Sequence, residues 1–207
     1  MDRETSDDLI TYSTGRKSET FPENYSNKKV LVIGAGALGN FTGLGLRLLE
    51  TGNIDIMDSD IIEETNLNRQ ILFYDGVGKE KARVLSERLS SPTVRVNHLI
   101  TRFDENTDIN GYDCIFDCVD NFETRVILSE KCKNNKIPLI SGGTSFSAGQ
   151  VVTYLPNITS TPNEILDLEK LVKTRERPEE HGCIYQPDPS VIMSNQIVGG
   201  LMVNEFR

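Results

Sequence analysis

The stretch Lys28–Asn40, KKVLVIGAGALGN, places a short apolar strand directly before a glycine-rich turn and the start of a helix. Gly34, Gly36 and Gly39 fit the pattern G-x-G-x-x-G. In such a turn the first glycine permits the tight bend, the second lets a phosphate approach the backbone, and the third lets helix and strand pack closely. The helix amino terminus adds partial positive charge. The stretch therefore predicts a turn that holds the phosphates of a nucleotide.

Strands and helices alternate along the rest of the chain. The expected strands span 29–33, 53–57, 93–99, 112–121, 137–143 and 149–155, and the expected helices span 38–50, 77–89, 122–133 and 191–206. This alternation predicts an α/β fold with a doubly wound, mostly parallel, Rossmann-like sheet and helices on both faces. We expect one domain over 28–207, after a flexible amino-terminal arm over 1–27. Residues 156–190 are expected to form a long surface or crossover loop, with a helical turn near Ile165–Leu171.

Composition excludes several classes of protein. With 207 residues, 37% of them hydrophobic and 26% charged, the chain suits one sizeable globular core. Its formal net charge of −9 argues against a general nucleic-acid binder, which needs clustered Lys and Arg. The first residues, MDRETSDDL, contain no apolar leader, and no run of eighteen apolar residues occurs. We therefore expect a cytoplasmic protein with no membrane partner.

Three of the four cysteines, Cys114, Cys118 and Cys132, lie in or near apolar segments and form no C-x-x-C pair. On a strand, Cys114 and Cys118 would be about 13 Å apart, which is too far to share a metal ion easily. We expect these three to be small buried hydrophobic side chains in a reducing compartment.

The stretch from Asp58 to Phe73, DSDIIEETNLNRQILF, follows the predicted strand NIDIM. Asp58 comes 19 residues after Gly39, where a carboxylate can accept hydrogen bonds from ribose hydroxyls. The alternative is an Asp that only caps the following turn. This much fits a nicotinamide-dependent dehydrogenase equally well. Four further polar residues then cluster within the stretch, namely Asn66, Asn68, Arg69 and Gln70. A dehydrogenase has no need for this cluster beside the ribose.

Two cations follow Asp58, Arg69 in this cluster and Lys81 twelve residues later at a predicted helix start. Arginine offers a planar fork to phosphate oxygens, and lysine offers a mobile point charge. Together they suit a triphosphate whose charge is held while the α-phosphorus is attacked. The alternative for each residue taken singly is structural: Arg69 caps a turn and Lys81 is solvated, as we expect of Lys79.

A third polar group, DCVDN at 117–121, ends the strand predicted to begin near Tyr112. Ligands of doubly wound folds bind at this end of the strands. Asp120 can hold Mg²⁺, which prefers one or two carboxylates plus phosphate oxygens, and Asn121 can hydrogen-bond the nucleotide. The alternative for Asp120 is a cap for the helix that begins at Phe122. Asp117 is expected to be structural.

These motifs, in this order, resemble the ThiF/MoeB/HesA family of adenylating domains, which are related to ubiquitin-activating enzymes. The resemblance rests on G-x-G-x-L-G, D-x-D, NLNRQ, G-K-x-K-A, and DCVDN with Arg125 four residues on. It covers 29–150 and resumes more weakly at 189–205, PSVIMSNQIVGGLMVNE.

The resemblance implies an ATP-dependent adenylyltransferase that uses ATP and Mg²⁺. Its substrate would be a ubiquitin-like or sulfur-carrier protein with a C-terminal Gly-Gly tail. The tail carboxylate attacks the α-phosphate, pyrophosphate leaves, and the acyl-adenylate is later taken by a sulfur nucleophile. A homodimer or heterodimer is implied as well.

Carried over to this chain, Arg69, Lys81 and Asp120 are the charge-handling catalytic residues, with Asp120 as the Mg²⁺ ligand. The expected nucleotide contacts are Gly34, Gly36, Ala37, Gly39, Asp58, Thr65, Asn66, Leu67, Asn68, Arg69, Gln70, Lys81, Asp120 and Asn121. Cys183 lies in the loop that carries a transfer thiol in some relatives, with His181 two residues before it. It is either that thiol or an incidental loop cysteine.

This chain departs from the family pattern in three places. Where the first C-x-x-C pair of a zinc site would fall, it has NEILDLEKL at 163–171, so we predict no structural zinc. The arm reads TYSTGRKSETF in place of the family's RYSRQ-like helix, so Arg16 is no more than a candidate stand-in for the arginine that reaches a partner's ATP. Later strands of the family are absent, as expected of a truncated form, a fragment of a longer activating enzyme or a naturally minimal form.

Three other functions compete with this one. An adenylating enzyme for a small peptide or a modified tRNA base shares the chemistry, although the acidic balance disfavours tRNA. A non-catalytic subunit of a heterodimeric activating enzyme is disfavoured by the joint presence of Arg69, Lys81 and Asp120. A nicotinamide-dependent oxidoreductase is disfavoured by the cation cluster and by the lack of an evident proton donor.

Overall fold

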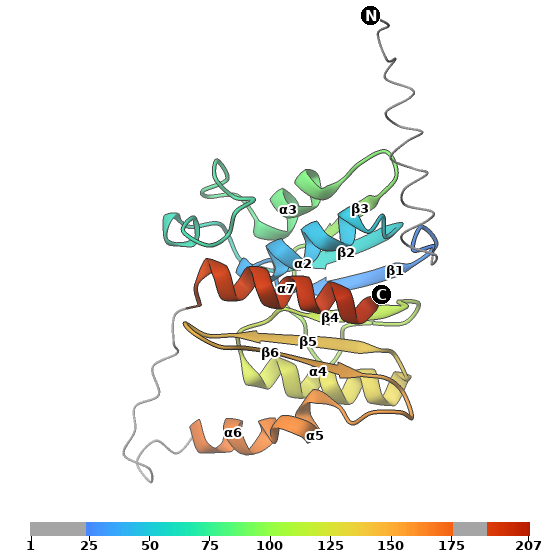
Figure 1. Ribbon diagram of the computed structural model, residues 1–207. Coiled ribbons are helices and arrows are strands. Elements are labelled where there is room, and N and C mark those ends of the chain that lie inside the picture. The colour runs from blue at the N-terminus through green and yellow to red at the C-terminus, as the bar shows by residue number, and fades with distance from the viewer. Residues whose placement is uncertain (1–23, 176–189) are drawn as a thin grey trace, which may run out of the picture.

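The computed structural model describes residues 24–175 and 190–207. Its strands form one six-stranded sheet in the order β3-β2-β1-β4-β5-β6 (Figure 1). The strands are β1 Lys29–Ile33, β2 Asn53–Met57, β3 Arg95–Leu99, β4 Cys114–Asp117, β5 Leu139–Thr144 and β6 Gly149–Tyr154. All neighbouring strands pair in parallel except β5 and β6, which are antiparallel. The predicted doubly wound, mostly parallel sheet is therefore confirmed.

Helices cover both faces of the sheet, as predicted (Figure 1). On one face lie α2 Ala37–Leu48, α3 Lys81–Leu89 and α7 Ile192–Phe206, with α7 packed along α2 and over β5 and β6. The other face carries α4 Phe122–Asn135, and a short 3-10 helix, η1, spans Glu64–Asn66. None of the helices in the described ranges is long and apolar enough to span a bilayer.

Strand β1 shows why the sheet is covered twice. Its sequence, KVLVI, is apolar at four successive positions, and all four side chains are buried. Val30 and Val32 join the core under α2, α3 and α7, whereas Leu31 and Ile33 join the core under α4. Successive side chains of a strand point to opposite faces, so a continuous apolar run requires a core on each side.

One predicted segment boundary is wrong, and one predicted helical turn is longer than expected. The flexible arm was expected to run to residue 27, but Tyr25 is only 5% exposed and its ring lies 5.3 Å from that of Phe206. Residues 1–23 lie outside the described ranges. The helical turn expected near Ile165–Leu171 in the 156–190 loop is present, but it extends into two helices, α5 Pro162–Leu166 and α6 Leu168–Arg175. They fold because they bury Leu168 and pack against α4, which local sequence does not reveal.

Candidate active site

The glycine turn between β1 and α2 has the geometry that the sequence predicts. Gly34 has φ +96°, and a Cβ there would lie 2.6 Å from the carbonyl oxygen of Cys118. A Cβ on Gly39 would lie 2.0 Å from the carbonyl oxygen of Gly34. Larger residues cannot fit at these two positions. Gly36 is the N-cap of α2, and because glycine has no side chain, no side-chain hydrogen bond caps the helix. The amides of the first turn are therefore available to an anion.

Three strand ends meet at this turn, on the carboxyl edge of the sheet. The amide of Gly34 donates to the carbonyl of Met57 (2.9 Å), and the amide of Cys118 donates to that of Ile33 (2.8 Å). The ends of β1, β2 and β4 are thereby tied together. The residues after these strands, among them Asp58 and Asp120, consequently share one edge.

Asp58 touches the glycine turn directly. Its Oδ2 accepts a hydrogen bond from the amide of Ala35 (2.7 Å), and its Oδ1 accepts one from the amide of Asp60 (2.7 Å). Burial raises the pKa of Asp58 above its usual value, and the two amide bonds and the charge of Lys81 oppose that rise. The carboxylate therefore orders the turn and stays half-buried beside it.

The polar cluster after Asp58 is held by its own hydrogen bonds. Asn66 is buried, and its Oδ1 accepts from the amide of Glu63 (3.0 Å), which closes η1. Arg69 uses Nη1 to donate to the carbonyl of Thr65 (3.1 Å) and to Oδ1 of Asn68 (2.8 Å). Gln70 is only 4% exposed. The side chains of Asn66 and Arg69 thus order the segment locally.

Gln70 and Asn40 connect this segment to the glycine turn. The side-chain nitrogen of Gln70, Nε2, lies 3.9 Å from where a Cβ on Gly36 would be. Its Oε1 is buried without a hydrogen-bond partner in the described structure. Asn40 was missed by the sequence analysis: its Nδ2 donates to the carbonyls of Ala35 and Gly36, and its Oδ1 accepts from the amide of Leu72. Its position directly after Gly39 was the available signal.

Lys81 is buried at the first turn of α3, so the alternative of a solvated lysine is wrong. Its Nζ lies 3.0 Å from Oδ2 of Asp60, and its amide donates to the carbonyl of Asp60 (2.9 Å). The expected helix start at Lys81 is confirmed, whereas the helical range expected from residue 77 begins too early, because Glu80 pairs with Ile61 in an isolated bridge before the helix. Asp60, the second aspartate of the D-x-D motif, is thus a further residue of the site, although no role was predicted for it.

Asp120 and Asn121 have different roles in the structure. Asn121 caps α4, with its Oδ1 accepting from the amide of Thr124 (2.8 Å). The alternative that Asp120 is the cap is therefore wrong. Asp120 is exposed, and no hydrogen bond or ion pair within the described ranges engages its carboxylate. Asp117, by contrast, is 1% exposed and bonded inside the core, as a structural residue would be.

The donor set at the edge fits Mg²⁺ only together with a polyphosphate. The exposed carboxylate of Asp120 stands there, and Mg²⁺ is bound in proteins through one or two carboxylates plus phosphate oxygens. Within 24–175 and 190–207 no three His, Cys, Asp or Glu side chains are grouped to hold a metal ion. Cys183, His181 and Arg16 fall outside the residues that the structure describes.

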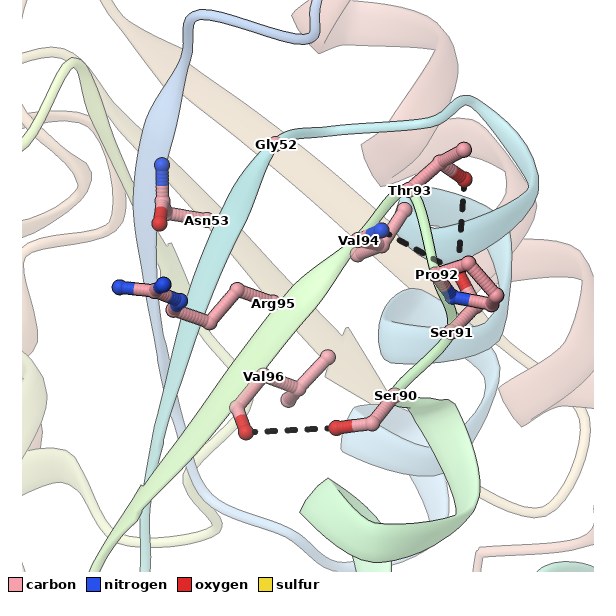
Figure 2. Close-up of a pocket in the computed structure, with 9 residues that line it drawn as sticks. All are labelled: Gly52, Asn53, Ser90, Ser91, Pro92, Thr93, Val94, Arg95 and Val96. Atoms are coloured by element: carbon pink, nitrogen blue, oxygen red, sulfur yellow. Dashed lines mark hydrogen bonds between the residues drawn. The ribbon is translucent and has the colours of Figure 1, made fainter.

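A hollow on the opposite edge of the sheet offers none of this chemistry (Figure 2). It lies at the amino ends of β2 and β3 and is lined by Gly52, Asn53, Ser90, Ser91, Pro92, Thr93, Val94, Arg95 and Val96. Arg95 is its only charged lining residue. The candidate site is therefore the carboxyl edge alone.

A doubly wound domain with a glycine turn and polar strand ends on its carboxyl edge defines a class of nucleotide-binding proteins. Residues 14–206 match the model of the ThiF family. The chain belongs to the ThiF family.

Two curated relatives and two solved structures illustrate the match. A molybdopterin-synthase adenylyltransferase of Haemophilus influenzae is 33% identical over 160 residues, 73% of this chain and 64% of the relative. A SAMP-activating enzyme E1 of Haloferax volcanii is 31% identical over 137 residues, 63% of this chain and 51% of the relative. The chain thus spans about half to two thirds of the length of these relatives.

The solved structures share the fold at lower sequence identity. E. coli MccB with ATP superposes with a TM-score of 0.71 at 24% identity, covering 88% of this chain and 55% of MccB. E. coli tRNA N6-threonylcarbamoyladenosine dehydratase, TcdA, in complex with ATP gives 0.72 at 23% identity, covering 96% of this chain and 93% of TcdA.

Proposed function

We propose that this chain binds ATP at the carboxyl edge of its sheet and adenylates the C-terminal carboxylate of a ubiquitin-like or sulfur-carrier protein. The observation that carries the proposal is the gathering of one glycine turn, a buried lysine, an arginine and a free carboxylate on one edge. The names of the two curated relatives, an adenylyltransferase and an activating enzyme, support the same chemistry.

In this proposal the nucleotide lies across the ends of β1, β2 and β4. The amides that begin α2, from Ala37 onward, face the phosphates, and Asp58 accepts from the ribose hydroxyls. The buried Oε1 of Gln70 supports a ligand beside the turn, because a buried acceptor without a partner is costly unless something bonds to it. Among the remaining contacts, Asn121 uses its amide nitrogen, since its Oδ1 is occupied by the helix cap.

Arg69 and Lys81 hold the triphosphate charge during the reaction. A carboxylate oxygen of the carrier attacks the α-phosphorus, the bond to the bridging oxygen breaks, and pyrophosphate leaves with the electron pair. Lys81 is ready for this role because it is buried and already charge-paired with Asp60. In the proposal its ammonium turns from Asp60 to the phosphates. Transfer of this type depends mainly on positioning and electrostatic stabilisation.

Asp120 would hold Mg²⁺, and its exposed, unengaged carboxylate fits that role. The ion, when bound with the triphosphate, neutralises phosphate charge. The protein's part is to present Asp120 beside the glycine turn, which the hydrogen bond between Cys118 and Ile33 achieves.

We further infer a dimer, a cytoplasmic location and transfer of the activated acyl group to sulfur. An apolar stripe on α7 supports the dimer, because Met193, Ile197 and Leu201 are each at least half exposed and recur every fourth residue. Buried, unpaired thiols at Cys114 and Cys118 are consistent with a reducing compartment. Cys183 remains the candidate thiol for transfer.

Exchange of labelled pyrophosphate into ATP, in the presence of candidate ubiquitin-like carriers, tests the proposal. We expect Arg69→Ala and Lys81→Ala each to lower the exchange rate by about 100-fold, because each removes charge held at the phosphates. Lys79→Ala is the matched control, since Lys79 is an exposed neighbour of Lys81. Exchange that survives both substitutions would contradict the site, and tighter binding of NAD than of ATP would contradict the class.

A further inference from the structure

Arg125 makes an unusual set of buried contacts one turn into α4. The residue is only 6% exposed. Its Nη1 donates to Oγ of Ser141 (2.9 Å), and its Nη2 donates to the carbonyls of Val119 (2.5 Å) and Gly142 (2.6 Å). Nη1 also lies 3.4 Å from Oδ2 of Asp117. One guanidinium thus binds the segment after β4 and the middle of β5 at the same time.

The rest of the network fixes the same two strands. Oγ of Ser141 donates to Oδ2 of Asp117 (2.6 Å), so its hydroxyl bridges the carboxylate and the guanidinium. Oδ1 of Asp117 accepts from the amide of Val119 (3.2 Å). Val119 is therefore held at its amide by Asp117 and at its carbonyl by Arg125. Only a planar fork of donors can make these contacts together, because a lysine offers a single ammonium.

The held peptide directly precedes Asp120, whose own side chain is unengaged within the described chain. On its other side the turn abuts the nucleotide loop, since the carbonyl of Cys118 lies against Gly34. The side chain of Asp120 makes no hydrogen bond or ion pair in the described structure that would hold it in place. The backbone at Val119 therefore determines where the Asp120 carboxylate stands relative to the glycine turn.

We propose that Arg125 is a positioning residue that sets the metal-binding geometry of Asp120 through Val119, with Asp117 and Ser141 as its supports. The inference rests on the proposed function, in which Asp120 holds Mg²⁺ with ATP. Residues that orient a metal ligand typically change metal affinity by about 10-fold to 100-fold when they are altered. Arg125 acts here without touching the nucleotide.

The first test uses the free protein and needs no ligand. Ser141→Ala removes the bridging hydroxyl, and Arg125→Lys keeps the charge but loses the fork. Ser129→Ala is the matched control, because it removes a buried hydroxyl from α4 whose one hydrogen bond within residues 24–175 and 190–207 is accepted from the amide of Asn163. We expect faster amide hydrogen exchange over 118–121 and 142–144 in both test variants and wild-type exchange there in the control. Wild-type exchange in the test variants would overturn the proposal.

The second test measures binding of a fluorescent ATP analogue against Mg²⁺ concentration. We expect Ser141→Ala and Arg125→Lys to need about 10-fold more Mg²⁺ for half-maximal binding, with Ser129→Ala unchanged. If Ser129→Ala, at the same loss of melting temperature as the test variants, also needed about 10-fold more Mg²⁺, the effect would come from general destabilisation. That result would overturn the proposal. Wild-type protein that binds no ATP would refute the proposed function itself, whereas wild-type Mg²⁺ dependence in all three variants would refute only the role of Arg125.

Discussion

Asp55 and Asp120 are both aspartates of the central sheet region, yet their surroundings are opposite. Asp55 is 6% exposed, and its oxygens accept from Nδ2 of Asn97 (2.6 Å) and from the hydroxyl of Tyr112 (2.7 Å). Lys29 adds an ion pair at 3.4 Å. Asp120 is exposed and has no such partner in the described ranges. A carboxylate with all its partners serves the fold, whereas one with open positions can serve a ligand.

In the cluster around Asp55, two of its partners, Lys29 and Tyr112, also contact each other. The ammonium of Lys29 lies 4.4 Å from the centre of the Tyr112 ring, and burial with the neighbouring carboxylate raises the pKa of Tyr112 well above its usual value. Every charge in the cluster therefore has a partner inside the molecule. Asp58 is intermediate, because it bonds to the glycine turn and is still half-exposed.

The same substitution at the two aspartates gives the sharpest contrast. We expect Asp120→Asn to lower the rate of ATP–pyrophosphate exchange by about 100-fold. The substitution removes the negative charge that would hold Mg²⁺, and the ion stabilises the charge of the transition state by several kcal/mol. The melting temperature of the variant should match that of the wild type, since no partner is lost. A stable Asp120→Asn variant with the wild-type rate of ATP–pyrophosphate exchange would show that Asp120 has no role in the reaction.

Asp55→Asn should show the reverse pattern. The amide can accept through only one oxygen and no longer carries the charge that pairs with Lys29, so one part-buried donor loses its partner and we expect the free energy of unfolding to fall by about 1 kcal/mol. Urea unfolding measures this loss of stability. The rate of ATP–pyrophosphate exchange per folded molecule should stay at the wild-type level. Unchanged stability, or exchange lost without unfolding, would show that the closed cluster has another role.

Asp58 tests the intermediate case through pH. Because burial raises its pKa, its contribution to folding is complete below the ordinary value and is lost as pH rises through the folded value. ATP binding has the opposite requirement, since the ribose hydroxyls need the ionised carboxylate as an acceptor. We expect ATP affinity to fall on acidification at a pH above the ordinary Asp value of 3.8. In Asp58→Asn the affinity should be weaker and flat across that window, and an equal pH dependence would contradict the assignment.

The smallest effect is expected far from the site, at Glu164 in the capping box of α5. Hydrogen bonds from Lys133 and from the amide of Thr161 lower the pKa of Glu164 to about 2. The contribution of Glu164 to stability is therefore present above its ordinary value of 4.5 and is lost as pH falls towards about 2. Glu164→Gln should melt slightly below the wild type near neutral pH and equally at pH about 2, with normal exchange throughout. A difference in melting that persists in acid would contradict this ion pair.

Local patterns predicted most of the fold and the placement of the nucleotide edge. The apolar run of β1, the alternation of strands and helices, and Gly34 followed by Asp58 are features of short segments, and each carries its own physical reason. The distinction between Asp117 and Asp120 was also accessible, because Asp117 lies three residues earlier in the predicted strand than Asp120, although β4 ends already at Asp117 and not at residue 121 as expected.

Partners distant in the chain could not be predicted in the same way. The pairing of Lys81 with Asp60 and the contacts of Arg125 with β5 depend on how segments pack, and no local period reveals them. The same holds for the length of α5 and α6, because the sequence predicts only a helical turn there and the packing that buries Leu168 against α4 is not visible in it. Tyr25 was likewise assigned to the arm because its ring contact, Phe206, lies at the other end of the sequence.

Mass spectrometry of the carrier after incubation with this chain, ATP and Mg²⁺ tests adenylation directly. We expect AMP joined to the C-terminal carboxylate of the carrier, with one pyrophosphate released for each adduct and none formed on a carrier that ends in a carboxamide. Release of ADP and phosphate instead of pyrophosphate, or an adduct on the carboxamide-ended carrier, would contradict adenylation of that carboxylate.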